Sequence, residues 1–347
     1  MSEKESFGQR LKAARAMRKM SVAQLSERTE GQVSINQISR LEKNVVYPSS
    51  SVLISIARAL NLRVDYFFRT NTVNIDHVEF RKRKSFGRKE TDALREDVRD
   101  RVERYLEIES LLGLDCPSFK GCQYKVQTSD DVIRAAKSIK KEWQLGEDGI
   151  SNVIEVVEDH GVIVIEVQVE DKFDGMGGFV SGRPFIVVNN MSTSERKRFT
   201  TLHELAHLVL DIAEGIDAER MCNDFANEML MSKEEFISKI GDKRKDISLE
   251  ELRDIQRHYG ISPDALMTKA HNLGVISDNR YKTFNVKKNM HKDFGHKVRE
   301  GLYAAETSFR FERLVFKAIA CNIISESKGA ALLNTQLSEI KSQLSLV

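Results

Sequence analysis

The sequence contains few cysteines, few prolines and no long apolar run. Its 347 residues include 4 Cys and 4 Pro, which argues against both a disulfide-stapled secreted domain and a proline-rich low-complexity chain. No stretch reaches the roughly 18 consecutive apolar residues that a membrane-spanning helix requires, so we expect no membrane partner. The N-terminus is charged from Glu3 onward and has no apolar segment. We therefore expect no signal peptide, a cytoplasmic location and reduced thiols.

Two of the four cysteines, Cys116 and Cys122, are close enough in sequence to bind a metal ion together. A zinc ribbon needs a second pair of ligands at suitable spacing, and the sequence offers none. The cysteines therefore do not predict a metal site. A chain of this length can also bury two or three hydrophobic cores without covalent staples.

Charge is nearly balanced over the whole chain but uneven along it. The formal net charge is +2, whereas residues 1–70 contain 12 Lys and Arg against 6 Asp and Glu, an excess of +6. A local basic excess of this kind is typical of surfaces that contact nucleic-acid phosphates. The first fifth of the chain is therefore a candidate nucleic-acid-binding segment.

Residues 7–69 are predicted to form a run of short helices. Apolar residues recur near helical spacing in the first of these segments. Ser21, followed three residues later by Gln24, is a capping-box pattern that predicts the start of a second helix. Further helices are expected over 52–61 and 64–69, which are rich in apolar residues.

A third helix is predicted in the middle of this run. Ser34 is a suitable N-cap for the sequence that follows, in which Ile35, Ile38 and Leu41 are spaced to face inward. We expect this helix to end before Pro48, because the residue before a proline rarely adopts the helical conformation. The polar residues between the apolar positions are then expected to face outward.

These segments resemble the Cro/CI-type helix-turn-helix of the XRE regulators, with a second helix over 22–29 and a recognition helix over 34–42. The resemblance implies that the recognition helix enters the major groove of DNA with its N-terminal residues against base edges. Asn36, Gln37 and Arg40 are expected to read bases, because amide and guanidinium groups can bond adenine and guanine edges. The residues expected to contact phosphates are Gln24, Ser34, Lys43 and Asn44.

The same resemblance implies a double-stranded DNA operator and a homodimer, since such domains usually bind paired half-sites. One feature departs from the family, because the turn at residues 29–33 is longer than usual by about one residue. The alternative interpretation of the whole segment is a small helical domain whose polar face is only solvated.

Residues 70–127 differ in composition from the segments on either side. A basic run at 81–89 contains six Lys and Arg and no acid, and it precedes a charged helix predicted over 90–112. Apolar residues on one face of that helix favour a solvated connector with one buried stripe over a DNA-tracking or dimerising helix. The basic run is expected to be exposed. If the chain cuts itself, we expect the cut between about 70 and 128, freeing the helix-turn-helix. The alternative, which we favour, is that the basic run is a phosphate-contacting extension that is never cut.

A new unit with both helices and strands is predicted to begin at Ser129. Two amphipathic helices come first. A β-branched run at 161–169 then predicts a strand, and residues 174–178 predict a glycine-rich turn. Residues 179–190 are expected to form two more strands, and helices are predicted to dominate from Thr193 onward.

The strongest chemical signal is the sequence His203-Glu204-Leu205-Ala206-His207. On a helix, residues four apart lie one turn above each other, so both imidazoles could bind one cation. Glu204 could then hold the attacking water of a metal-dependent hydrolase. The flanking residues are apolar, and polar side chains on a buried helix are costly unless something satisfies them. A chance occurrence of the H-E-x-x-H spacing is the alternative.

A zinc site with one open position needs a third protein ligand. We favour Glu219, because it lies three residues before Cys222 on the apolar face of the next helix, where a free carboxylate would be penalised. A helix packed antiparallel to the first could place Glu219 opposite the histidines. The other candidates are Asp211, Glu214, Asp217, Asp224 and Glu228.

Residues 150–275 resemble the ImmA/IrrE family of bacterial metallopeptidases. A strand around 184–189, the H-E-x-x-H helix and a ligand helix over 219–231 occur in the family's order. The family usually has alanine where this chain has Cys222, and often proline where it has Ser232. The resemblance implies a zinc ion, or alternatively manganese, with Glu204 as the base and with the metal ligands His203, His207 and Glu219.

The sequence thus predicts an α+β, mostly α protein with an all-α helix-turn-helix domain, a zincin-like domain with a small sheet, and a helical C-terminal region. The expected ranges, including a charged linker, are 1–70, 71–128, 129–278 and 279–347. The predicted function is a DNA-binding transcriptional regulator, of the phage, stress or toxin–antitoxin kind, whose metallopeptidase domain cleaves a regulator protein or itself. The alternative is a non-catalytic repressor or antitoxin that uses this domain as a sensor or as a platform for a toxin.

Overall fold

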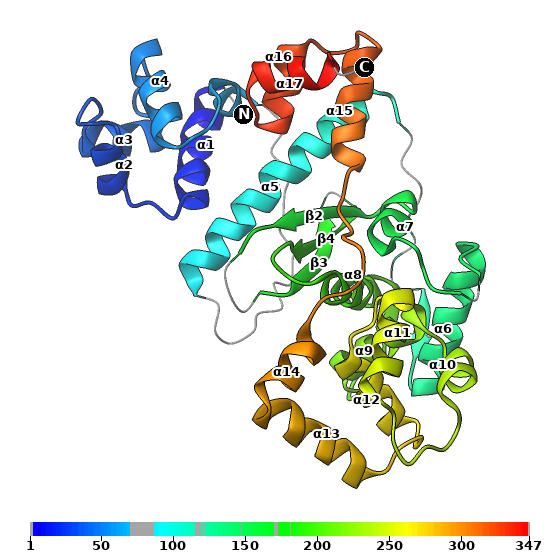
Figure 1. Ribbon diagram of the computed structural model, residues 1–347. Helices are drawn as coiled ribbons and strands as arrows, with labels where there is room; N and C mark the ends of the chain where they lie inside the picture. The colour runs from blue at the N-terminus through cyan, green and yellow to red at the C-terminus, as the bar shows by residue number, and fades with distance from the viewer. Residues whose placement is uncertain are drawn as a thin grey trace. The chain divides into compact units, whose positions relative to one another are not determined.

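In the part of the chain that it describes, the computed structural model is mainly helical, with two small β-sheets (Figure 1), as the predicted α+β, mostly α class requires. It describes residues 3–69, 87–114, 119, 121, 123–146, 148–169, 173–180 and 182–345. Cys116, Cys122 and residues 81–86 of the basic run lie outside this part of the chain. Among the described residues, no helix combines the length and the apolar character needed to cross a membrane. They form two compact units, one from both ends of the chain and one from the middle.

The first unit begins with the predicted run of short helices. Its elements are α1 (Glu3–Met17), α2 (Val22–Arg28), α3 (Ile35–Glu42), α4 (Ser50–Ala59) and the 3-10 helix η1 (Val64–Phe68). Ser21, Ser34 and Ser49 cap three of these helices, each accepting a hydrogen bond from the backbone N–H three residues later. One shared core includes Phe7, Leu11, Leu25, Val33, Ile38, Leu41 and Ile56.

Ile35 does not face inward, contrary to the expectation from its spacing. Ile38 and Leu41 are fully buried, but Ile35 is 53% exposed. It is the first residue of α3 and directly follows the Ser34 N-cap. Ile35 therefore lies at the end of the helix, about one turn before the positions that the core covers.

The same unit contains a long helix and the C-terminal end of the chain. Its further elements are α5 (Arg88–Leu111), α15 (Arg310–Ala320), α16 (Glu326–Leu333) and α17 (Leu337–Leu344). α5 buries the predicted apolar stripe but also several charged side chains. Arg10 of α1 donates to Glu103 of α5 at 2.5 Å, and Arg69 donates to Asp100 at 2.7 Å. α5 is therefore packed against the N-terminal helices and is more than a solvated connector.

The C-terminal helices are attached to α5 by further buried polar contacts. Arg310, at the start of α15, donates to Tyr105 Oη at 2.8 Å and to Glu109 at 3.0 Å. Arg104 of α5 donates to the backbone carbonyl of Leu332 in α16 at 2.6 Å. The two ends of the chain thus share one packed unit, and residues 117–308 are inserted between α5 and α15. The four domain ranges expected from the sequence remain a prediction.

The second unit contains a three-stranded sheet in the order β2–β4–β3. β2 (Ile163–Val167) pairs parallel with β4 (Arg183–Asn189), which pairs antiparallel with β3 (Gly175–Val180). A separate parallel pair joins β1 (Tyr124–Val126) to β5 (Leu210–Ile212), and the sequence does not predict it. The small sheet expected for this part of the chain is therefore present, with a second, shorter one.

The other regular elements described in the second unit are helices. They are α6 (Ser129–Glu142), α7 (Val153–Asp159), α8 (Ser194–Val209), α9 (Ala218–Leu230), α10 (Lys233–Ile240), α11 (Leu249–Tyr259), α12 (Pro263–Asn272), α13 (Asp278–Met290) and α14 (Lys292–Arg299). α8 lies against one face of the three-stranded sheet (Figure 1). There Val164, Ile186 and Val188 share a buried core with Leu202 and Leu205 of α8.

The glycine-rich segment that the sequence predicts as a turn is instead part of strand β3. Gly175 and Gly177 pair with Val188 and Ile186 of β4, so they lie on the sheet face that α8 covers. A Cβ atom added to Gly175 would overlap the Thr200 methyl group. The glycines are therefore explained by close packing of α8 on β3 and not by a turn.

Candidate metal centre and recognition helix

Helix α8 carries the H-E-x-x-H sequence and is fixed at its N-terminal end by polar contacts. Thr193 caps the helix by accepting a hydrogen bond from the backbone N–H of Arg196. The buried carboxylate of Glu195 accepts from Gln256 Nε2 and from the backbone N–H of Leu302, both at 2.7 Å. These bonds connect α8 to α11 and to the segment that follows α14.

Arg198 fixes the next turn of α8. It is fully buried and forms an ion pair with Glu306. Its Nη2 donates to the backbone carbonyls of Ile150 at 2.7 Å and Tyr259 at 3.1 Å, and its guanidinium lies 4.3 Å from the ring centre of Tyr303. Burial raises the pKa of the Glu306 carboxyl, and the attraction of Arg198 opposes that shift. This network sets the rotation of α8 and hence the direction of its histidines.

The side chains of His203 and His207 converge with that of Glu219. The two Nε2 atoms are 3.1 Å apart. One carboxylate oxygen of Glu219 lies 3.4 Å from His203 Nε2, and the other lies 3.6 Å from His207 Nε2. One possible ligand atom from each residue thus lies within 4.8 Å of the others. The structure brings together the three residues that the sequence favours, and metal binding by them remains a prediction.

Glu219 comes from the first turn of α9, which packs against α8. Its side chain is 61% exposed, so the expectation that it lies on the buried face of its helix is wrong. The end of the helix holds the carboxylate at the solvent side of the two histidines, whose side chains are 14% and 9% exposed. A cation would therefore enter from the Glu219 side.

Two other candidate third ligands lie elsewhere. Asp211 is exposed on β5. Glu228 is buried and lies 3.8 Å from the Lys269 ammonium. Burial raises the pKa of Glu228 and lowers that of Lys269 to about 8, and the attraction between the two groups opposes both shifts. Glu228 thus balances the charge of the buried Lys269 ammonium.

A contact that the sequence does not predict connects Cys222 to His207. Cys222 is fully buried on α9, and its Sγ lies 3.0 Å from His207 Nδ1. A histidine that binds a metal through Nε2 usually bonds a partner through the other ring nitrogen, and this bond fixes the ring. Cys222 is placed for that role. Its position one helical turn from Glu219 was the available signal in the sequence.

Glu204, which directly follows His203 on α8, lies close to strand β3. It is 8% exposed. A Cβ atom added to Gly177 would lie 3.4 Å from both Cβ and Oε2 of Glu204, so the carboxylate is near the backbone of β3. Among the described strands, β3 is an edge of its sheet. The acid expected to act as a base is therefore partly enclosed and next to a strand edge.

Helix α3 exposes most of the residues expected to read DNA bases. Asn36 and Arg40 are exposed, and Gln37 is partly buried. Ser34 Oγ accepts a hydrogen bond from the backbone N–H of Gln37 at 3.2 Å, which defines where the helix begins. Lys43, expected to contact phosphate, is exposed just after the helix. Contact of these side chains with DNA remains a prediction.

Two further residues expected to contact phosphates also make hydrogen bonds within the domain. Gln24 Oε1 accepts from the backbone N–H of Ser21 at 2.8 Å and completes the predicted capping box. Asn44 Oδ1 accepts from the backbone N–H of Gly8 at 2.8 Å. Asn44 therefore connects the end of α3 to α1, whatever contact it makes with DNA.

Comparison with known protein families finds matches to two segments of the chain. A peptidase family model described as an IrrE N-terminal-like domain matches residues 157–271. A model described as a helix-turn-helix domain matches residues 8–73. The chain joins an XRE-type helix-turn-helix domain to an IrrE-like peptidase domain. The two resemblances drawn from the sequence are thereby confirmed, and a search of curated proteins finds no match.

The side chains at the centre of the peptidase domain suit a divalent cation. Two imidazole nitrogens and one carboxylate oxygen, with a position left open for water, are a common ligand set of catalytic zinc sites. The three donor atoms come from His203, His207 and Glu219 and surround one small space. This donor set fits the metal that the family implies.

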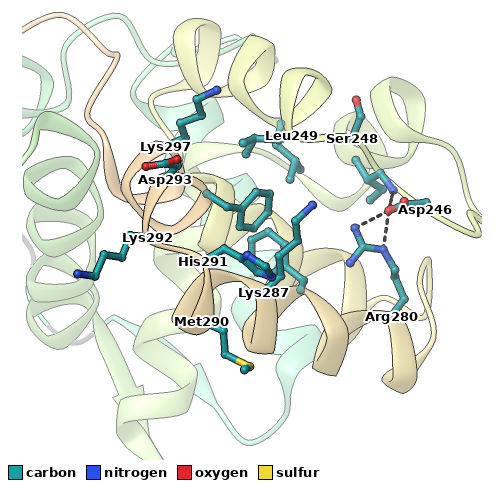
Figure 2. Close-up of a pocket in the computed structure, with 14 residues that line it drawn as sticks. Asp246, Ser248, Leu249, Arg280, Lys287, Met290, His291, Lys292, Asp293 and Lys297 are labelled. Carbon is teal, nitrogen blue, oxygen red and sulfur yellow. Dashed lines mark hydrogen bonds and ion pairs between the residues drawn. The ribbon is translucent and has the colours of Figure 1, made fainter.

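A separate pocket of about 680 Å³ lies between α11, α13 and α14 (Figure 2). Two of the residues that line it, Phe284 and Leu252, are buried, and Lys287 also lines it. At one end, Asp246 accepts a hydrogen bond from Arg280 at 2.5 Å. None of the residues of the candidate metal centre lines this pocket. It is therefore distinct from the candidate metal centre.

Proposed function

We propose that this protein is a DNA-binding transcriptional regulator whose peptidase domain hydrolyses a peptide bond with the help of a zinc or manganese ion. The observation that carries this proposal is the convergence of His203, His207 and Glu219, on and beside the helix that holds Glu204. The substrate is a regulator protein or the chain itself. The first unit would bind a double-stranded operator through α3, as a homodimer on paired half-sites.

Each residue of the centre has a defined role in this proposal. His203, His207 and Glu219 would hold the cation, which when bound supplies Lewis-acid activation of a water molecule. The Glu204 carboxylate would accept a proton from that water and later deliver it to the amine that leaves. The contacts of Arg198 and Glu195 with neighbouring segments hold α8 in the rotation that these roles need.

The edge of strand β3 offers a place for a peptide substrate. An extended peptide can add to an exposed sheet edge through main-chain hydrogen bonds. Gly177 of β3 lies close to Glu204, so a peptide bound along this strand would present its backbone near the carboxylate. Binding through the main chain would leave the choice of substrate to a few side-chain contacts.

The direct test is to incubate the full chain with zinc or manganese and to search for fragments by mass spectrometry. Glu204→Gln is the matched control, because it removes the base while leaving His203, His207 and Glu219 in place. We expect fragments of the chain or of a co-purified regulator with the wild type and none with the variant. Metal binding and DNA binding without fragments in either protein would contradict catalysis and favour a sensor or protein-binding platform.

A further inference from the structure

Ile35 is an apolar side chain at the reading end of the recognition helix. It is 53% exposed, whereas Ile38 and Leu41 of the same helix are fully buried. The Ser34 cap makes Ile35 the first residue of α3. In a helix-turn-helix, the N-terminal residues of this helix are the ones that approach base edges. The core of the domain therefore does not account for this isoleucine.

Two other residues exposed on α3 are polar. Asn36 directly follows Ile35, and Arg40 lies five residues further along than Ile35. Both side chains can donate hydrogen bonds to adenine or guanine in the major groove. The isoleucine of the same helix cannot form such bonds, so any contribution it makes to DNA binding must be apolar.

The major groove offers one apolar group on its base edges, the C5-methyl group of thymine. We infer that Ile35 contacts a thymine methyl group and sets a preference for an A·T pair next to the bases read by Asn36. This inference rests on the proposed DNA-binding function and adds a specificity-determining residue to it. An apolar contact between two copies of the chain is the competing use of the same side chain, and it would be insensitive to the thymine methyl group.

The test uses the full chain and duplexes selected by it from a random-sequence library. Each thymine of the selected duplex is replaced in turn by deoxyuridine, which removes only the methyl group. We expect the wild type to bind roughly fourfold more weakly at one thymine or at a symmetric pair, the loss expected for one buried methyl contact. Ile35→Ala should bind the thymine and deoxyuridine duplexes equally.

Ile54→Ala is the matched control, because Ile54 is an exposed isoleucine of the same domain, 44% exposed on α4. It should retain the deoxyuridine effect of the wild type. A selected duplex without a sensitive thymine, or an equal effect in wild type and Ile35→Ala, would overturn the inference.

Arg40→Ala separates this outcome from failure of the proposed function. If Arg40→Ala weakens binding to the selected duplex while deoxyuridine has no effect, DNA reading by α3 stands and the role of Ile35 is overturned. If no duplex is enriched by the wild type, both the proposed DNA-binding function and the inference about Ile35 are overturned.

Discussion

The thiol of Cys222 gives a test of the metal centre that involves a single side-chain contact. Cys222→Ala removes the partner of His207 Nδ1, so the ring loses its orientation and the Kd for zinc should rise about tenfold. Cys222→Ser keeps a hydrogen-bonding group and should recover part of the affinity. Competition with a chelator of known affinity measures both values.

Cys321→Ala is the control for the loss of a thiol, because Cys321 is an exposed free cysteine far along the sequence from the centre. It should leave the Kd unchanged. A Cys222→Ala protein that binds zinc as tightly as the wild type would show that the thiol does not position His207.

Arg40 and Lys43 should differ in the kind of DNA binding that they support. Arg40 is exposed on α3 and is expected to read a base, so Arg40→Ala should cost about 1–3 kcal/mol on the selected duplex and relax the preference at one position. Lys43→Ala should weaken binding to all duplexes about equally, because a phosphate contact has no sequence preference. Titrations against selected and random duplexes compare them, and an equal loss on both for Arg40→Ala would exclude base reading.

Among single residues, those with a fixed spacing on one helix were predictable, and those defined by packing between helices were not. The i, i+4 spacing of His203 and His207 indicated that both imidazoles could approach one cation. The contact between Cys222 and His207 depends on how α9 packs against α8. The exposure of Ile35 depends on where the other helices of its domain end, which its spacing in α3 does not reveal.

At the scale of elements, the packing of α8 on β3 should be sensitive to the addition of one methyl group at Gly175. A Cβ on Gly175 would overlap the Thr200 methyl group and lie 2.9 Å from the carbonyl oxygen of Val187. Gly175→Ala should therefore reduce the free energy of unfolding by about 1–3 kcal/mol. Gly177→Ala should cost less, because its Cβ would lie 3.4 Å from Glu204.

Urea unfolding of the two glycine variants measures this difference. Thr200→Ser, which removes the overlapping methyl group, should restore part of the stability lost in Gly175→Ala. Equal costs for Gly175→Ala and Gly177→Ala would contradict the close packing of α8 on β3.

The helices were more predictable than the strands, for a physical reason. Ser21, Ser34 and other caps, together with apolar periodicity, mark helices within a short stretch of sequence. The glycines of β3 read locally as a turn, whereas their reason is the distant helix α8. Strands β1 and β5 are three residues each, too short to show an alternating pattern.

At the scale of the whole molecule, the helix-turn-helix domain is held by more than its connection to the following residues. Arg10 pairs with the buried Glu103 of α5, and Arg69 pairs with Asp100. We expect that a cut introduced at a protease site placed within residues 70–86 leaves the domain bound to the rest of the chain. Size-exclusion chromatography of the cut protein measures this.

Glu103→Ala should release the domain after the same cut, because removal of one partner of a buried ion pair costs about 3–5 kcal/mol. The uncut Glu103→Ala protein gives the reference elution volume for this measurement. Separation of the wild-type fragments would contradict the packing of α1 on α5 and would support release of the domain by cleavage.

The expected domain ranges could not anticipate this arrangement. Composition and charge mark the stretch after residue 70 as different from its neighbours, but they do not show that Arg310 and α16 return to α5. Contacts between segments about 200 residues apart leave no periodic signal in either segment. The peptidase domain was predictable because its H-E-x-x-H pattern lies within a short stretch of sequence.

The measurement that tests the central claim most directly is the divalent metal content of the purified chain and its variants at micromolar metal. We predict about one zinc or manganese ion per chain for the wild type and for Glu204→Gln. Content should fall well below one for His203→Ala, His207→Ala and Glu219→Ala. A wild type without bound metal, or retention of the metal by the His203, His207 and Glu219 variants, would contradict the assignment of this centre.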